Sequence, residues 1–159
     1  MTDPARALLR HAVATVAYRG AKACRDAPTD FAAFRIAPGS RSAGEILAHI
    51  GDLYDWATRM AEGNWTWTTA SPLSWDAEIE RFHLTLAKFD AYLASDAPLG
   101  YPAETLLQGP VADSLAHIGQ LAQMRRVAGS PIRGESYARA EIVAGRTGGH
   151  QASPRVEFD

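Results

Sequence analysis

The sequence predicts an all-α protein, a four-helix bundle with a short C-terminal extension. Apolar residues recur at three- and four-residue spacings in four segments, and residues typical of helix ends bound each segment. No strand-like alternation, internal repeat or low-complexity block interrupts this pattern. Amphipathic helices without a sheet bury their apolar faces against one another. We therefore expect one domain over 1–159, with the bundle at about 4–130 and a tail at about 131–159.

The first helix is predicted over about 4–25. Asp3 is a suitable N-cap, and Pro4 fits the first helical position, where its missing N–H costs nothing. The following segment, 26–41, contains two prolines, a glycine and several short polar residues. Because these residues favour turns, we interpret it as a long surface loop.

The second helix is predicted over about 42–62. Ser42 and Glu45 have the spacing of a capping box, and apolar residues follow with a period near 3.6. The loop after this helix carries Trp65 and Trp67. Tryptophans in a loop indicate either a pocket wall or interface, or packing over the end of the bundle.

Two further helices complete the predicted bundle. The third begins at Ser74 and ends near Ser95, and its apolar residues form a regular seam. The fourth follows Gly109 and Pro110 and ends at Gly129. In the tail we expect one short helix over roughly 136–144, followed by an extended polar segment.

Composition limits the classes of function. Sixteen basic and eighteen acidic residues give a net charge of -2 without a basic stripe, so no nucleic-acid partner is expected. The one cysteine, Cys24, cannot form an internal disulfide. The N-terminal segment lacks the apolar core of a signal peptide, and no window resembles a membrane span. We expect a cytoplasmic protein without a membrane partner.

The candidate metal ligands are His49, Asp113 and His117. Asp113 and His117 are four residues apart on a predicted helix and therefore share one face. His49 lies on the second helix and can supply a third ligand across the bundle. Two imidazoles and one carboxylate suit Zn²⁺, Fe²⁺ or Ni²⁺ and leave a position open for water or substrate. The alternative is ordinary: a surface Asp–His pair beside a hydrogen-bonded histidine.

Four neighbouring residues have weaker claims to a role in this site. Asp52 is one turn beyond His49 and is either an acceptor for a ligand imidazole or simply solvated. Gln120 is within one turn of His117. Arg125 and Arg126 are candidates for holding an anionic substrate or a cofactor carboxylate, or are cations favoured at a helix C-terminus.

Two motifs resemble the DinB-like superfamily, also called DinB/YfiT-like. The run HIGQLAQMRRVAG at 117–129 is similar to that family's HRGQL-then-Arg-then-Gly signature, and LAHIGDLYDW resembles its second helix. Downstream, ESYARAEIVAG resembles the segment after the family's bundle, so the resemblance extends to about residue 146. It implies a bundle of DinB/YfiT type and a divalent metal held by one histidine of the second helix and two of the fourth.

By position, that ligand set becomes His49, Asp113 and His117. Asp113 departs from the pattern, since many members carry histidine there, although the mycothiol-dependent isomerase branch uses a carboxylate. The resemblance implies a metal-dependent enzyme, a thiol S-transferase or hydrolase, with a low-molecular-weight thiol such as mycothiol or bacillithiol as a cofactor. We also expect a homodimer that acts on a small-molecule substrate.

A second hypothesis is a dimeric helical scaffold, or a metal-binding protein whose site is degenerate and does not catalyse. Its interface would be the loop around Trp65 and Trp67 or an exposed helix face. DNA repair, a third hypothesis, follows only from the family's name, and the acidic charge balance argues against it.

Overall fold

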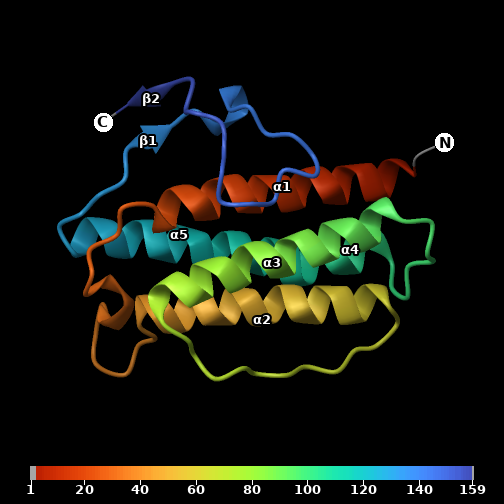
Figure 1. The fold of residues 1–159 in the computed structure, drawn as a ribbon, viewed down its shortest axis with the longest axis horizontal. Coiled ribbons are helices and arrows are strands. Elements are labelled where there is room, and N and C mark those ends of the chain that lie inside the picture. Colours follow the sequence, from red (N-terminus) through yellow and green to blue (C-terminus); the bar gives the residue numbers. More distant parts are fainter. Residues whose placement is uncertain (1–2, 159) are drawn as a thin grey trace.

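The computed structural model describes residues 3–158, and in it the predicted all-α bundle is confirmed. Four long helices lie side by side (Figure 1). They are α1 (Pro4–Cys24), α2 (Ala43–Ala61), α3 (Trp75–Ala94) and α5 (Ala112–Val127). Helices α1 and α2 each pack against both α3 and α5, so the four form a closed ring around one core.

The first three helices begin and end within a residue or so of their predicted bounds because their caps are local. The Asp3 carboxylate accepts a hydrogen bond from the backbone N–H of Ala5, one of the groups at a helix start without an intrahelical partner. In the capping box of α2, Ser42 Oγ accepts from the Glu45 N–H at 3.2 Å, and the Glu45 carboxylate accepts from the Ser42 N–H at 2.7 Å. The 26–41 connection is a loop, as predicted, with one 3-10 turn at Phe31–Ala33.

The fourth long helix, α5, begins at Ala112, just after Gly109 and Pro110 as predicted, but helical structure extends further back than expected. It begins with α4 (Ala103–Leu106) and continues through a π-helical turn (Leu107–Val111) into α5. A π turn is wider than an α turn, and Pro110 lies within it. Pro110 therefore precedes the regular α-helix as expected, whereas the helical segment 103–111 was not predicted.

The core lies between the four helices and is made of aliphatic and aromatic side chains. Its largest fully buried members include Leu47, Ile50, Tyr54, Phe82, Phe89 and Leu121. Helices α1 and α3 approach closely at Gly20, where an added Cβ would lie 2.4 Å from the ring of Phe82. This packing fixes the relative positions of the helices and therefore of the side chains on their outer faces.

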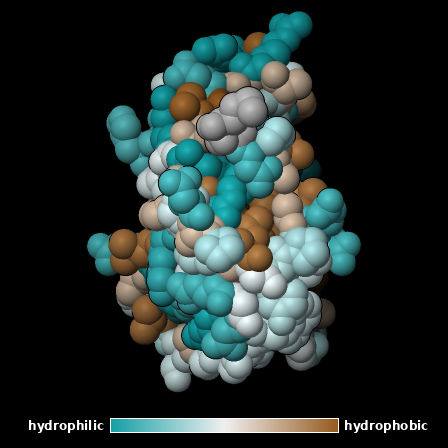
Figure 2. Space-filling view, turned by 90° about the vertical axis from the view of Figure 1, so that its right-hand side faces the viewer, coloured by the Kyte–Doolittle hydropathy of each residue, from teal (hydrophilic) through white to brown (hydrophobic). Residues whose placement is uncertain are grey.

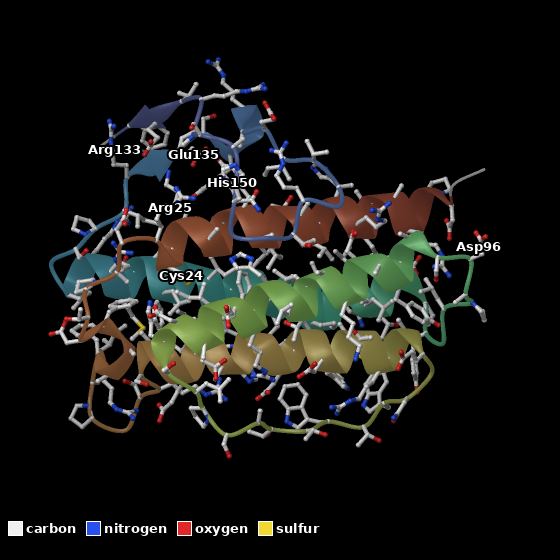
Figure 3. The ribbon with its side chains drawn as sticks, in the orientation of Figure 1. Cys24, Arg25, Asp96, Arg133, Glu135 and His150 are labelled. Atoms are coloured by element: carbon white, nitrogen blue, oxygen red, sulfur yellow. The ribbon has the colours of Figure 1, made fainter. Side chains whose placement is uncertain are left out.

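The tail differs from its prediction. The helix expected over 136–144 is wrong: the structure has only a 3-10 turn at Tyr137–Arg139, and β1 (Gly134–Glu135) pairs antiparallel with β2 (Glu157–Phe158). Glu135 lies between the tail and α1 (Figure 3), where its carboxylate accepts from Tyr18 at 2.5 Å and from Lys22 at 2.7 Å. These long-range pairs hold the tail against α1.

The surface is mixed in character. Seen from the end where α1 begins, the surface shows small hydrophobic patches scattered among hydrophilic groups (Figure 2). The hydrophobic patches do not join into a continuous apolar face in this view. Within residues 3–158, the helices are all too short or too polar to span a bilayer.

Candidate metal centre

The structure brings the three predicted ligands together in the groove between α2 and α5. His49 projects from α2, and Asp113 and His117 project from consecutive turns of α5. One ligand atom from each lies within 4.8 Å of the other two. The capping box at Ser42 fixes the start of α2 two turns before His49, and the π-helical turn ends directly before α5, two residues from Asp113. Both helices are therefore locally anchored beside the site.

The distances suit a single ion. The Asp113 carboxylate lies between the two imidazoles, with Oδ2 3.8 Å from His49 Nε2 and Oδ1 3.5 Å from His117 Nε2. Two ligands about 2.1 Å from one tetrahedral ion are roughly 3.4 Å apart, close to both separations. The imidazole rings are 4.8 Å apart between centroids and nearly perpendicular, so they do not stack against each other. These separations need only small side-chain rotations to meet an ion.

Both histidines present nitrogen lone pairs suited to a metal. His117 Nδ1 is 2.9 Å from the Gln120 side-chain oxygen, and when the Nδ1–H donates to it, Nε2 faces Asp113 as an acceptor. For His49, burial is the main cause that lowers the pKa, and the nearby positive charge of Arg41 lowers it further. A lowered pKa keeps the imidazole neutral at pH 7, the form that binds metals.

The site is open on the side of Asp113. The side chains of His49 and His117 are 19% and 13% exposed, whereas that of Asp113 is 47% exposed. A hollow of about 300 Å³ borders His49, and another of about 370 Å³ borders His117. Three protein ligands with solvent and two hollows beside them match the arrangement of a catalytic metal site rather than a closed structural one.

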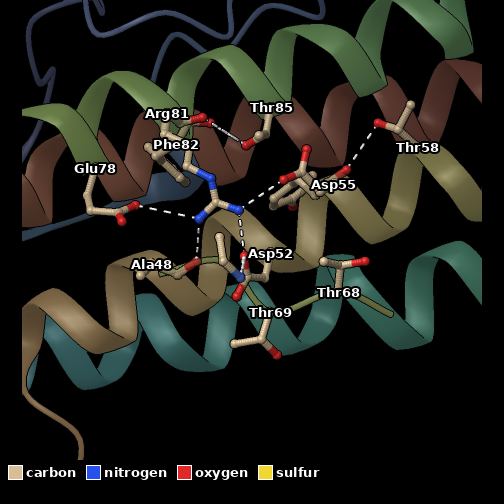
Figure 4. Close-up of polar contacts among 12 residues, drawn as sticks. Ala48, Asp52, Asp55, Thr58, Thr68, Thr69, Glu78, Arg81, Phe82 and Thr85 are labelled. Carbon is tan, nitrogen blue, oxygen red and sulfur yellow. Dashed lines mark hydrogen bonds and ion pairs between the residues drawn. The ribbon is translucent and has the colours of Figure 1, made fainter. Parts of the chain in front are cut away.

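Behind His49, Arg81 of α3 holds a cluster of acidic groups (Figure 4). Its guanidinium donates to Asp52 at 2.5 Å, to Asp55 at 2.9 Å and to the Ala48 carbonyl at 3.0 Å. Glu78 lies 3.6 Å from the same guanidinium. We expected Asp52 to be either solvated or hydrogen-bonded to a ligand imidazole, and both expectations were wrong. Its buried carboxylate pairs with Arg81 and thereby joins α2 to α3.

The loop between α2 and α3 covers the outer face of α2 with aromatic side chains. The Trp67 ring lies 5.6 Å from the ring of His49 and 5.6 Å from Trp56, and Trp56 lies 5.4 Å from Trp65. Trp65 and Trp67 remain 50% and 40% exposed. They lie alongside α2, and Trp67 forms one wall beside the candidate site.

Of the two candidate arginines, Arg125 has a structural role. It is 3% exposed, and its guanidinium donates to the carbonyls of Ala23, Arg25 and Ser130 at 2.8–2.9 Å. All three acceptors lie at helix ends, so Arg125 joins the end of α1 to that of α5 instead of facing the ligand set. Arg126 is exposed near the end of α5.

Sequence reasoning missed two residues that shape this site. Arg81 escaped notice because its partners are on another helix, although the i, i+3 pairs Asp52–Asp55 and Glu78–Arg81 were a usable signal. Arg41 was counted as part of a loop, yet it borders both hollows. Only the path of that loop places it there.

Comparisons with known proteins add no relative. A scan of protein-family models found no match, and searches of curated proteins and of solved structures found no significant similarity.

Proposed function

We propose that this protein is a divalent-metal-dependent enzyme of the thiol S-transferase or hydrolase type, with the metal held by His49, Asp113 and His117. One observation carries the proposal: three ligand atoms from two helices lie within 4.8 Å of one another at a surface-open groove. The resemblance of the two helical motifs to the DinB-like superfamily supports the same ligand set and reaction class.

The donor set fits zinc, nickel or iron. Imidazole nitrogens suit all three ions, and a single carboxylate adds one negative charge without closing the coordination sphere. Bound there, a divalent ion lowers the pKa of a coordinated thiol or water and thereby supplies a nucleophile at neutral pH. A low-molecular-weight thiol is the cofactor that we propose.

The chain's own residues do the positioning. Gln120 orients the imidazole of His117 through Nδ1. In metal sites generally, losing such a hydrogen-bond partner of a ligand lowers the affinity for the metal about 10- to 100-fold. The half-buried His49 stays neutral and ready to bind. The exposed carboxylate of Asp113 borders the side from which a small-molecule substrate approaches.

Spectroscopy and turnover together test this proposal. Cobalt-loaded wild-type protein is expected to show the ligand-field absorption of a low-symmetry site, and metal-dependent turnover in a screen of thiol-transfer and hydrolysis substrates. His117→Ala should lose both while keeping its helical circular dichroism, whereas His11→Ala, which changes an exposed histidine of α1, should keep both. Cobalt binding without turnover of any substrate would contradict the proposed enzymatic activity and leave a metal-binding protein.

A second candidate is a dimeric scaffold, favoured by the exposed Trp65 and Trp67. Exposed tryptophans are enriched where proteins meet. Sedimentation at micromolar concentration is expected to give a dimer that Trp65→Ser weakens; a monomer in wild type would contradict it. We also propose a cytoplasmic location, which cell fractionation tests.

A further inference from the structure

Arg41 differs from most arginines in the described part of the chain because its guanidinium makes no hydrogen bond or ion pair there. Arg10, Arg35, Arg59 and Arg81, for example, each donate hydrogen bonds to side chains or carbonyls. Within residues 3–158, the interaction recorded for Arg41 is its electrostatic effect on His49. It is exposed and lies just before the cap of α2. Its five N–H donors are available to a ligand.

Arg41 also borders both hollows beside the candidate ligands. The hollow next to His49 is bordered by Arg41, Glu45 and Asp52, and the one next to His117 by Arg41, Ile46 and Met124. Each hollow is therefore bordered by one candidate ligand histidine and by the same arginine.

The acidic groups of the first hollow do not cancel this charge, because each already has an arginine. Glu45 forms a two-point pair with Arg35 at 2.8 and 2.9 Å. Asp52 accepts from Arg81 at 2.5 Å and from the Ala70 N–H at 3.2 Å. A divalent ion with one carboxylate ligand would leave a further positive charge. The rim is thus suited to an anion.

The second hollow adds an apolar surface. Ile36, Ile46 and Met124 border it; Ile46 and Met124 belong to the buried core, whereas Ile36 is 55% exposed although it is a large hydrophobic residue. An aliphatic segment placed there removes this apolar surface from water. The two hollows together combine a cationic point, an apolar wall and the ligand set.

We propose that Arg41 is the substrate-recognition residue of this site and that the substrate is a small organic carboxylate with an aliphatic arm. The carboxylate pairs with the guanidinium of Arg41, the arm lies against Ile36, Ile46 and Met124, and the reacting group reaches the position beside His117. This assignment rests on the metal site proposed above. It names the class of molecule that the site accepts.

The test uses thiols as probes because a thiolate anchors one end at the metal. Cobalt-loaded full-length protein is titrated with mercaptopropionate and mercaptohexanoate, and with the neutral mercaptopropanol and mercaptohexanol, following the sulfur-to-cobalt charge-transfer absorption. We expect at least one carboxylate to bind about tenfold more tightly than its matching alcohol, the factor for one exposed charge-assisted pair. Arg41→Gln should remove that preference.

Two controls separate the inference from the proposal on which it rests. Arg139→Gln removes an exposed arginine that borders neither hollow, and it should keep the preference. Cobalt content and ligand-field absorption are measured in each variant. Absence of cobalt in wild-type protein would defeat the metal site itself. Three other outcomes would overturn the proposed role of Arg41 while leaving the metal site in place. In each of them cobalt is bound, but no probe binds, no carboxylate is preferred, or the preference survives Arg41→Gln.

Discussion

Two clusters of ionisable side chains in this bundle are each centred on one carboxylate but differ in how fully that carboxylate is paired. In the tail anchor, defined by Tyr18, Lys22 and Glu135, the contacts are 2.5 and 2.7 Å and the Glu135 side chain is completely buried. In the candidate metal centre, Asp113 is 3.5 to 3.8 Å from its histidines and is half exposed. The first cluster has no capacity left for a ligand, and the second has both space and unused lone pairs. Incomplete pairing, rather than charge, distinguishes the candidate metal centre from the tail anchor.

Removing the central acid of the tail anchor should have the largest effect on stability. Among residues 3–158, Glu135→Gln leaves the buried Lys22 with the more distant Glu157, at 3.3 Å, as its counter-charge. Breaking a buried pair from one side costs about 3 kcal/mol, so the free energy of unfolding in urea should fall by about that amount. Metal binding should not change. The control Glu141→Gln alters a carboxylate that is itself 43% exposed and whose arginine partners are 34% and 58% exposed, so it should have little effect.

Metal binding at the candidate metal centre should stabilise the folded protein. Zinc at about 100 times its dissociation constant should raise the free energy of unfolding by about 2.7 kcal/mol, because it binds the folded chain and not the unfolded one. Thermal melts of wild type with and without zinc measure this. In Asp113→Ala the gain should vanish. An equal gain in that variant would mean that zinc binds elsewhere.

Two glycine substitutions contrast a packed interface with the helix that carries the site. Gly20→Ala places a Cβ 2.4 Å from Phe82 and should destabilise the protein by about 2 kcal/mol through overpacking. Gly119→Ala, on α5 close to His117, meets nothing within 4 Å and should stabilise it by about 0.5–1 kcal/mol through helix propensity. Urea unfolding of both variants is the measurement. A loss of stability in Gly119→Ala would place an unexpected neighbour on the open face of α5.

The smallest effect concerns His83, which lies outside both clusters under the tail. Burial lowers its pKa, and its Nδ1 is 2.8 Å from the Thr147 carbonyl. The unfolded chain therefore takes up a proton more readily, so stability is present above the ordinary pKa of about 6.5 and is lost as the pH falls through that region. The free energy of unfolding of the metal-free protein, measured at several pH values below and above 6.5, should rise with pH. His83→Gln should reduce this dependence on pH. An unchanged dependence would assign it to other groups.

The sequence was sufficient for the four long helices and for the shared face of Asp113 and His117, because both depend on local spacing. The capping box of Ser42 and Glu45 lies within one turn, and Asp113 and His117 share a face by their separation alone. The tail anchor could not be predicted, since Glu135 finds Lys22 across 113 residues of sequence. Arg41 was missed for the same reason: a loop's path depends on tertiary packing and not on its composition. The helical segment 103–111 was not predicted, because Gly109 and Pro110 signal a helix boundary and here lie within a π turn.

Metal content is the most direct test of the central claim. Wild-type protein purified without chelator is compared with His49→Ala, Asp113→Ala, His117→Ala and the control His11→Ala by plasma mass spectrometry. We expect stoichiometric zinc, nickel or iron in wild type and in the control, and loss of this metal in each of the three ligand variants. If the wild-type protein takes up no metal even after incubation with these ions, or if the ligand variants retain it, then His49, Asp113 and His117 do not form the metal site.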